Sequence, residues 1–417
     1  MLFRSEVLEK QKYPVRHYTP GGEIIKPYDI ASWSLPLHKG VESYEIDTRS
    51  EALEASLEKI SGVYSLKGNV PDDYYALVFP ARNNESYQAI FMAHQKGMEV
   101  GFAPEDITTH QQPLEGGAFV IPFSGSKKDE MQQIISEMTV EPFILKDEPA
   151  FEVEELKFPR IALVETYTHD MDAGWTRYLF DTYQINYDVL RPDQIPQQDL
   201  DGYDVIVFPD NNKSIFLSGS YASDNYYRMS SYPPEFVKGM GKEGLQKVMH
   251  FVNQGGKVIS WGQSTELFMG KQTISTGDGE EEEETFKLPV SNRADQVRKA
   301  GFYCPGSLVQ VNLDPNSLLN AGMPETTGIF HRGDPVLQTS IPVFDMDRRV
   351  LGHFPEEDIL LSGYAEEAGQ IAGNPSHIWL KKGKGEIIMF SFRPQFRAST
   401  AANYKMIFNG LLFTNQP

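Results

Sequence analysis

One stretch of the sequence, residues 159–210, constrains the fold more than any other. Short β-branched runs at 160–165 and 204–208 predict strands, and apolar residues at helical spacing over 175–183 predict a helix between them. Strands that alternate with helices are typical of a parallel α/β sheet. Such sheets bind ligands at the carboxyl ends of their strands, so loops 166–174 and 210–213 are the first places to look for a site. Neither loop contains a cysteine.

The sheet is expected to continue to the end of a large domain, residues 158–414. Within it, the pattern predicts a helix at 244–253, a central strand at 257–261 and the start of another helix at 265–269. Further strands are expected at 308–313 and 350–354, then a hairpin of 377–380 with 386–390, and an apolar helix over 404–413. We therefore predict an α/β fold, a flavodoxin-like parallel sheet with helices on both faces.

A smaller α/β domain is expected before the large one, at residues 61–147. Segments 75–103 and 117–145 form a near-repeat of strand, Pro-containing turn, amphipathic helix and strand, with Pro80 and Pro122 in equivalent places. This repeat predicts two β-α-β units. The prolines and weak strand signals of residues 1–60 indicate a linker that packs on another surface, and residues 146–157 form a second, acidic linker.

The charge and composition exclude several classes of partner. A formal net charge of −20 argues against binding to nucleic acid or to an anionic membrane, because both require clustered Lys and Arg. No apolar stretch approaches the roughly 20 residues of a membrane helix, and residues 1–12 are too charged for a signal peptide. The acidic run 280–284 is expected to be a solvated loop, with a calcium site as the minor alternative.

Cys304 is the single cysteine, so the chain cannot form an internal disulfide. One cysteine does not indicate whether the cellular compartment is oxidising or reducing. We expect its side chain to be packed in the interior and not to act as a nucleophile.

The turn after strand 257–261 occupies the position of a nucleophile elbow in hydrolase-like sheets. The residues at the elbow are Gly262 and Gln263, and neither side chain can attack a substrate. Ser264 follows, but the nearest candidate base, His250, lies on the preceding helix. We therefore predict a turn without catalytic activity.

Of the nine histidines, only one has a second potential metal ligand at a spacing typical of metal sites. His353 and Glu356 form an H-x-x-E pair whose third ligand would have to be His377, and Pro355 at a strand end favours an ordinary turn. We predict no metal site and no cofactor.

Polar residues at the predicted strand ends are the candidates for ligand binding. Asp170 and Asp172, in an acidic cluster with His169, can either cap the next helix or contribute to a site. Arg393 and Arg397 can clamp a carboxylate or pair with the aspartates of the same rim. The candidate ligand-binding residues are Asp170, Asp172, Trp175, Asp210, Gln263, Glu266, Arg393 and Arg397.

Several motifs together resemble the C-terminal half of bacterial zinc carboxypeptidases of the carboxypeptidase A type. In those proteins a linker and a class I glutamine amidotransferase-like domain follow the metallopeptidase domain. The motifs lie at 28–37 (YDIASWSLPL) with 40–42, 81–85, 171–177, 302–307, 360–363 and 392–397. The metallopeptidase domain itself has no counterpart here, so the chain is expected to be part of a longer protein or the product of a split gene.

The resemblance implies a secreted or periplasmic parent protein that acts on peptides. This chain would be its non-catalytic accessory region, with a zinc carboxypeptidase domain as partner and a peptide or cell-wall ligand. Two alternatives remain. One is an independent amidase or hydrolase that uses Asp170, Asp172, Glu266 and Arg393. The other is a carbohydrate or small-ligand binding module in which Trp175, Tyr226 and Tyr227 provide stacking faces.

Overall fold

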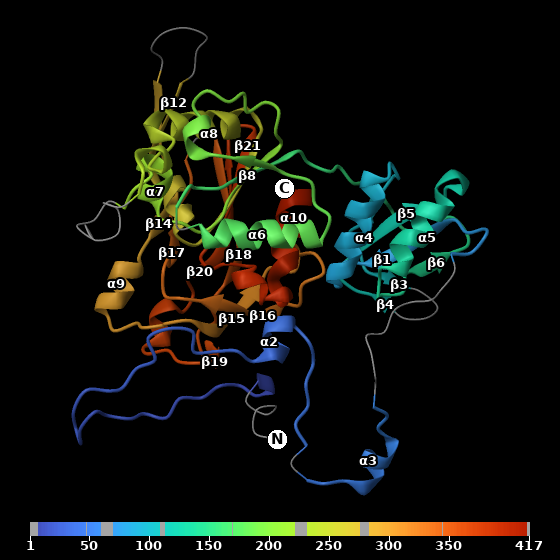
Figure 1. Cartoon of the computed structure of the whole chain (residues 1–417), viewed down its shortest axis with the longest axis horizontal. Coiled ribbons are helices and arrows are strands. Elements are labelled where there is room, and N and C mark those ends of the chain that lie inside the picture. The colour runs from blue at the N-terminus through green and yellow to red at the C-terminus, as the bar shows by residue number, and fades with distance from the viewer. Residues whose placement is uncertain are drawn as a thin grey trace. The chain divides into compact units, whose positions relative to one another are not determined.

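The structure is a computed structural model that describes residues 7–46, 48–59, 70–108, 113–168, 170–221, 232–275, 283–343 and 345–414. The chain divides into two compact units (Figure 1). The large unit consists of Met1–Lys39 and Lys157–Pro417, and the small unit of Gly40–Leu156. The segment 1–60, expected to be one linker, is therefore shared between the two units.

Five parallel strands form half of a ten-stranded sheet in the large unit. They are β8 (Ile161–Val164), β9 (Asp188–Leu190), β10 (Val205–Phe208), β11 (Lys257–Trp261) and β21 (Gly385–Phe390). Numbered along the chain, their order in the sheet is 2-1-3-4-5, which is one of the two common orders of doubly wound sheets. The connections reverse direction between β8 and β10, so this is where a ligand site is expected.

Helices cover both faces of these parallel strands, as the continuous apolar runs of the strands require. On one face, Val248 and Met249 of α8 (Gly241–Gln254) join a buried cluster with Ile206 and Val258. On the other, α10 (Tyr404–Leu412) approaches the sheet closely at Gly410, where a Cβ would lie 3.1 Å from Ile259 Cδ1. Helix α6 (Met171–Thr182) is its neighbour (Figure 1), and the ring of Tyr183 after α6 contacts Phe408.

The other half of the sheet is antiparallel, so the expected parallel sheet covers five of the ten strands, and the expected hairpin of 377–380 with 386–390 joins the two halves. Only Gly383 and Lys384 join β20 to β21, and so short a connection permits an antiparallel hairpin but no parallel crossover. The antiparallel strands are β15 (Ser307–Leu313), β16 (Thr326–His331), β18 (Met346–His353), β19 (Leu360–Ser362) and β20 (Pro375–Lys382).

The segment after β11 also differs from expectation. Instead of an α-helix beginning near residue 265, a 3₁₀ helix spans Gly262–Phe268, and β12 (Gly270–Ser275) follows at once. β12 pairs with β13 (Glu283–Leu288), so the last two residues of the acidic run belong to a strand, and the rest of that run lies outside the described residues. The large unit also contains α2 (Leu35–Lys39), α7 (Lys213–Ser218), α9 (Ala294–Lys299), β14 (Val290–Asn292) and β17 (Leu337–Thr339).

The small unit contains the two predicted β-α-β units, but they interleave. The first is β1 (Ala76–Pro80), α4 (Asn84–Gln95) and β2 (Gly101–Ala103), and the second is β5 (Ala118–Pro122), α5 (Lys128–Ser136) and β6 (Phe143–Leu145). The sheet order is β6-β1-β5-β2-β7 and its pairs are antiparallel, which is the split β-α-β arrangement. The small unit also contains α3 (Glu51–Ser56), β3 (Ile107–Thr108), β4 (Pro113–Leu114) and β7 (Glu154–Glu155).

The motif at 28–37, which lies in the segment expected to pack on another surface, packs on the rest of the large unit. Ile30 and Leu37 lie against a cluster of Leu308, Phe330 and Phe396. The backbone N–H of Ala31 donates to the carbonyl of Gly306 at 2.7 Å. The segment is thus held by apolar contacts together with a main-chain hydrogen bond.

Across the described ranges, the structure contains no helix with the length and apolar character needed to cross a membrane.

Candidate functional site

A pocket of about 180 Å³ lies where α6 begins and where β10, β11 and β21 end. It combines six of the eight predicted residues, because the carboxyl ends of parallel strands meet at one edge of the sheet. These six are Asp172, Trp175, Asp210, Gln263, Arg393 and Arg397, and the pocket is completed by Met171, Asn211, Asn212 and Tyr221.

Asp172 is a buried carboxylate in the wall of this pocket, with 6% of its surface exposed. Its Oδ2 accepts hydrogen bonds from the backbone N–H of Asp210 at 3.0 Å and from the indole N–H of Trp261, and its Oδ1 accepts one from Gln395 at 2.9 Å. Burial raises the pKa of Asp172 to about 6, although the nearby Arg393 acts in the opposite direction. These hydrogen bonds join the start of α6 to the carboxyl ends of β10 and β11 and to the turn after β21.

Asp210 and Arg393 form an ion pair beside Asp172. The other carboxylate oxygen of Asp210 accepts a hydrogen bond of 2.7 Å from the backbone N–H of Gln263. Burial works to lower the pKa of Arg393, but the charges of Asp210 and Asp172 raise it above its ordinary value. The sequence left open whether these arginines clamp a ligand or pair with the aspartates of the rim. The structure shows such a pair between Arg393 and Asp210.

Gly262 occupies the elbow position with a φ of +61°. A Cβ at this position would lie 2.0 Å from Oδ1 of Asp210, so the carboxylate fills the space that a nucleophilic side chain would need. Ser264 is fully buried, and its hydroxyl is bonded to the carbonyls of Phe208 and Trp261, both at 2.8 Å. Neither residue can present a nucleophile to the pocket.

Asp170 caps α6 and does not line the pocket. Its carboxylate accepts hydrogen bonds from the backbone N–H of Ala173 at 3.1 Å and from the Thr166 hydroxyl at 2.8 Å. Burial raises the pKa of Asp170 to about 6, and the charge of Asp172 contributes to this shift. Of the two aspartates, this is the one that serves as the helix cap.

Glu266 does not join the pocket. Its carboxylate accepts a hydrogen bond of 2.8 Å from Asn292, which also bonds Asp334. Glu266 lies in the 3₁₀ helix that follows β11. Three residues considered with the candidates, His169, Tyr226 and Tyr227, lie outside the described residues.

Sequence reasoning missed two residues that organise the site, Trp261 and Gln395. Both are buried, and both donate to Asp172. Trp261 is the last residue of β11 and Gln395 lies in the motif 392–397, so their positions at strand ends were the available signal.

No group of three or more His, Cys, Asp or Glu is placed to hold a metal ion within the part of the chain that the structure describes. His377 is buried, hydrogen-bonded to Asn320 at 3.1 Å and stacked on Phe390, and burial lowers its pKa to about 3. His353 is exposed at the end of β18. His377 is thus not placed to act as the third ligand of the His353 and Glu356 pair.

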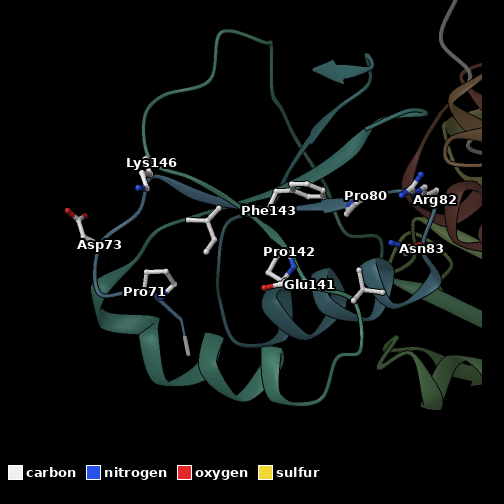
Figure 2. Close-up of a pocket in the computed structure, with 11 residues that line it drawn as sticks. Pro71, Asp73, Pro80, Arg82, Asn83, Glu141, Pro142, Phe143 and Lys146 are labelled. Atoms are coloured by element: carbon white, nitrogen blue, oxygen red, sulfur yellow. The ribbon is translucent and has the colours of Figure 1, made fainter. Parts of the chain in front are cut away.

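The small unit has a hollow of its own, of about 720 Å³ (Figure 2). Phe143 of the edge strand β6 lies at its centre, with Arg82 and Asn83 at one end and Asp73 and Lys146 at the other. Its charges have both signs and are spread along its length. None of the predicted site residues belongs to it.

Comparisons with known proteins give only weak similarities. No family model and no curated protein matches the sequence. Among solved structures, ThuA-like proteins from Bacteroides uniformis and Parabacteroides merdae are 10% and 11% identical, each with a TM-score of 0.33, and the match covers 63% of this chain and 94% of theirs. A β-galactosidase from Rahnella sp. R3 is 12% identical with a TM-score of 0.31, and the match covers 68% of this chain and 33% of that one. The chain thus spans about a third of the length of that β-galactosidase, and TM-scores this low carry no argument about fold or function.

Proposed function

We propose that this chain is a non-catalytic, ligand-binding accessory region of a zinc carboxypeptidase-like protein. The observation that carries the non-catalytic part is the contact of Gly262 with Asp210, because the carboxylate occupies the place of the nucleophile. The strand order 2-1-3-4-5 supports a flavodoxin-like, class I glutamine amidotransferase-like fold for the large unit. The peptidase partner and the exported compartment rest on the sequence motifs alone.

The absence of catalysis is tested by assaying the purified chain for release of ammonia from glutamine and for cleavage of peptide amides. We expect no turnover above that of buffer, and Ser264→Ala should change nothing. Turnover that disappears in Asp172→Asn, while an exposed control such as Asp181→Asn retains it, would instead establish the alternative enzyme that uses the strand-end rim.

The accessory role is tested by adding a purified zinc carboxypeptidase domain from the same genome. Sedimentation velocity should show a complex with the full chain, and the complex should persist when the zinc is replaced by cobalt. A peptidase domain that sediments independently of this chain at every concentration tested contradicts the partnership.

Trp175 favours one further candidate function, a small-ligand binding module. Its side chain is 37% exposed at the pocket and makes an edge contact with Tyr178. An exposed indole beside an ion pair can stack on a planar or sugar ring. Titration with peptides and sugars should then quench tryptophan fluorescence in the wild type and not in Trp175→Ala. Equal quenching in both proteins excludes Trp175 as the binding face.

A further inference from the structure

A second hollow of the large unit lies next to the candidate pocket and has the opposite character. It encloses about 260 Å³, and its lining residues are Ile30, Ser32, Trp33, Leu35, His38, Lys39, Phe396, Arg397 and Ser399. Trp33 and Leu35 are 45% and 46% exposed there. None of these described lining residues is acidic. The lining of the hollow is thus largely apolar, and its charged side chains, Lys39 and Arg397, are both basic and exposed.

Arg397 belongs to both hollows. Its side chain is exposed, and its guanidinium lies 5.4 Å from the ring centre of Phe396. Among the described residues it makes no ion pair or hydrogen bond, whereas Arg393 of the same turn is paired with Asp210. Of the two arginines in this turn, Arg393 is therefore neutralised by Asp210, and Arg397 is available to pair with an anion.

The backbone of the turn fixes the position of this cation. Arg397 and Ala398 both have a φ of +52°, a left-handed conformation that costs free energy for residues other than glycine. Buried hydrogen bonds hold the turn in this shape: the Thr400 hydroxyl donates to the carbonyl of Pro394 at 2.7 Å, and Gln395 donates to Asp172. Strained backbone that is held in this way is typical of binding sites.

We propose that the hollow binds an organic carboxylate that carries an apolar group. The apolar group would lie between Trp33, Leu35 and Phe396, where its removal from water favours binding. The carboxylate would bond the guanidinium of Arg397, which offers two parallel donors. This site adjoins the aspartate-lined pocket, with which it shares Arg397, and the proposal does not depend on whether that pocket is catalytic.

Calorimetric titration of the full chain with 3-phenylpropionate tests the proposal, with 3-phenylpropan-1-ol and propionate as matched probes. We expect 3-phenylpropionate to bind with one molecule per chain, and the alcohol and propionate each to bind at least tenfold more weakly. Failure of 3-phenylpropionate to bind, or equal affinity for the alcohol, overturns the proposal.

Two variants locate the site. Arg397→Gln should weaken binding of 3-phenylpropionate at least tenfold and leave the alcohol unaffected, and Leu35→Ser should weaken binding of both. Their matched controls, Arg349→Gln and Ile341→Ser, alter exposed side chains outside both hollows and should bind as the wild type does. Unchanged affinity in folded Arg397→Gln overturns the assignment.

Sedimentation velocity addresses the other occupant of an apolar surface, a second copy of this chain. A dimer that dissociates in Leu35→Ser would assign the surface to self-association and overturn the proposal, and a monomer supports it. Hydrolytic turnover together with intact 3-phenylpropionate binding would overturn only the proposed non-catalytic function.

Discussion

The side-chain amide of Gln395 donates a hydrogen bond of 2.9 Å to Oδ1 of Asp172, from a position 223 residues away in the sequence. This contact joins the start of the first helix in the parallel sheet to the turn that follows its last strand. Because the turn also carries Arg393 and Arg397, the geometry of both hollows depends on it. Asp172 is therefore the residue whose replacement reports most directly on the candidate site.

Asp172→Ala should lower the free energy of unfolding by about 2–4 kcal/mol. It removes the acceptor of three hydrogen bonds and leaves the buried donors of Trp261 and Gln395 without that acceptor. Asp172→Asn keeps the shape and one acceptor oxygen, so its effect should be smaller. Urea unfolding followed by tryptophan fluorescence measures both, and equal stability of Asp172→Ala and the wild type would contradict this account.

Gly262→Ala should destabilise the protein by about 1–3 kcal/mol, because alanine is strained at a φ of +61° and its Cβ would collide with Asp210. Gly174→Ala is the matched control. Gly174 lies in α6, and a Cβ added to it would meet no neighbouring atom within 4 Å, so alanine there should stabilise the helix by about 0.5–1 kcal/mol. Thermal unfolding of the two variants should show shifts of opposite sign.

Asp170 should make the stability of the protein fall as the pH rises from about 4 to about 6. Its pKa is raised from 3.8 to about 6, so the folded protein keeps a proton that the unfolded chain has already lost in this range. Asp170→Asn removes this titration and retains a good helix cap. The difference in unfolding free energy between the wild type and Asp170→Asn should therefore decrease with rising pH.

Asp204 is a control for this prediction, because its pKa is shifted in the direction opposite to that of Asp170. Hydrogen bonds from Arg160 lower its pKa below the ordinary value, so its contribution is present at neutral pH and is lost as the pH falls. The difference between the wild type and Asp204→Asn should increase with rising pH. Profiles of the same slope for Asp170→Asn and Asp204→Asn would refute the assignment of the raised pKa.

Cys304 should react with a thiol reagent only after the protein unfolds. The side chain is 4% exposed, its thiol donates to the carbonyl of His331, and burial raises its pKa to about 11. Since the chain contains a single cysteine, Ellman's reagent reports on this site alone. Labelling of the native protein as fast as in urea would show that the thiol is accessible.

Much of the local structure could be predicted from the sequence. The strand at Lys257–Trp261 was located to the residue, and those at 160–165 and 204–208 to within one residue at each end. Six candidate residues were brought together because strand ends in a parallel sheet share an edge. Glu266 does not line this pocket and lies in a 3₁₀ helix, which periodicity does not distinguish from an α-helix in so short a segment.

The sequence by itself determined several of the strands and helices, among them the strand at 257–261 and the helix at 244–253, because hydrophobic periodicity and turn residues act over a few neighbouring positions. It also determined that the elbow lacks a nucleophile, since Gly262 and Gln263 can be read directly from it. Tertiary structure alone decided that the antiparallel part of the large sheet extends beyond the expected hairpin to five strands, and that the two β-α-β units interleave. It also decided that Arg393 pairs with Asp210 while Asp172 bonds Trp261 and Gln395. These choices depend on contacts between residues far apart in the chain, where packing and the need to satisfy buried polar groups select one arrangement among several that local patterns allow.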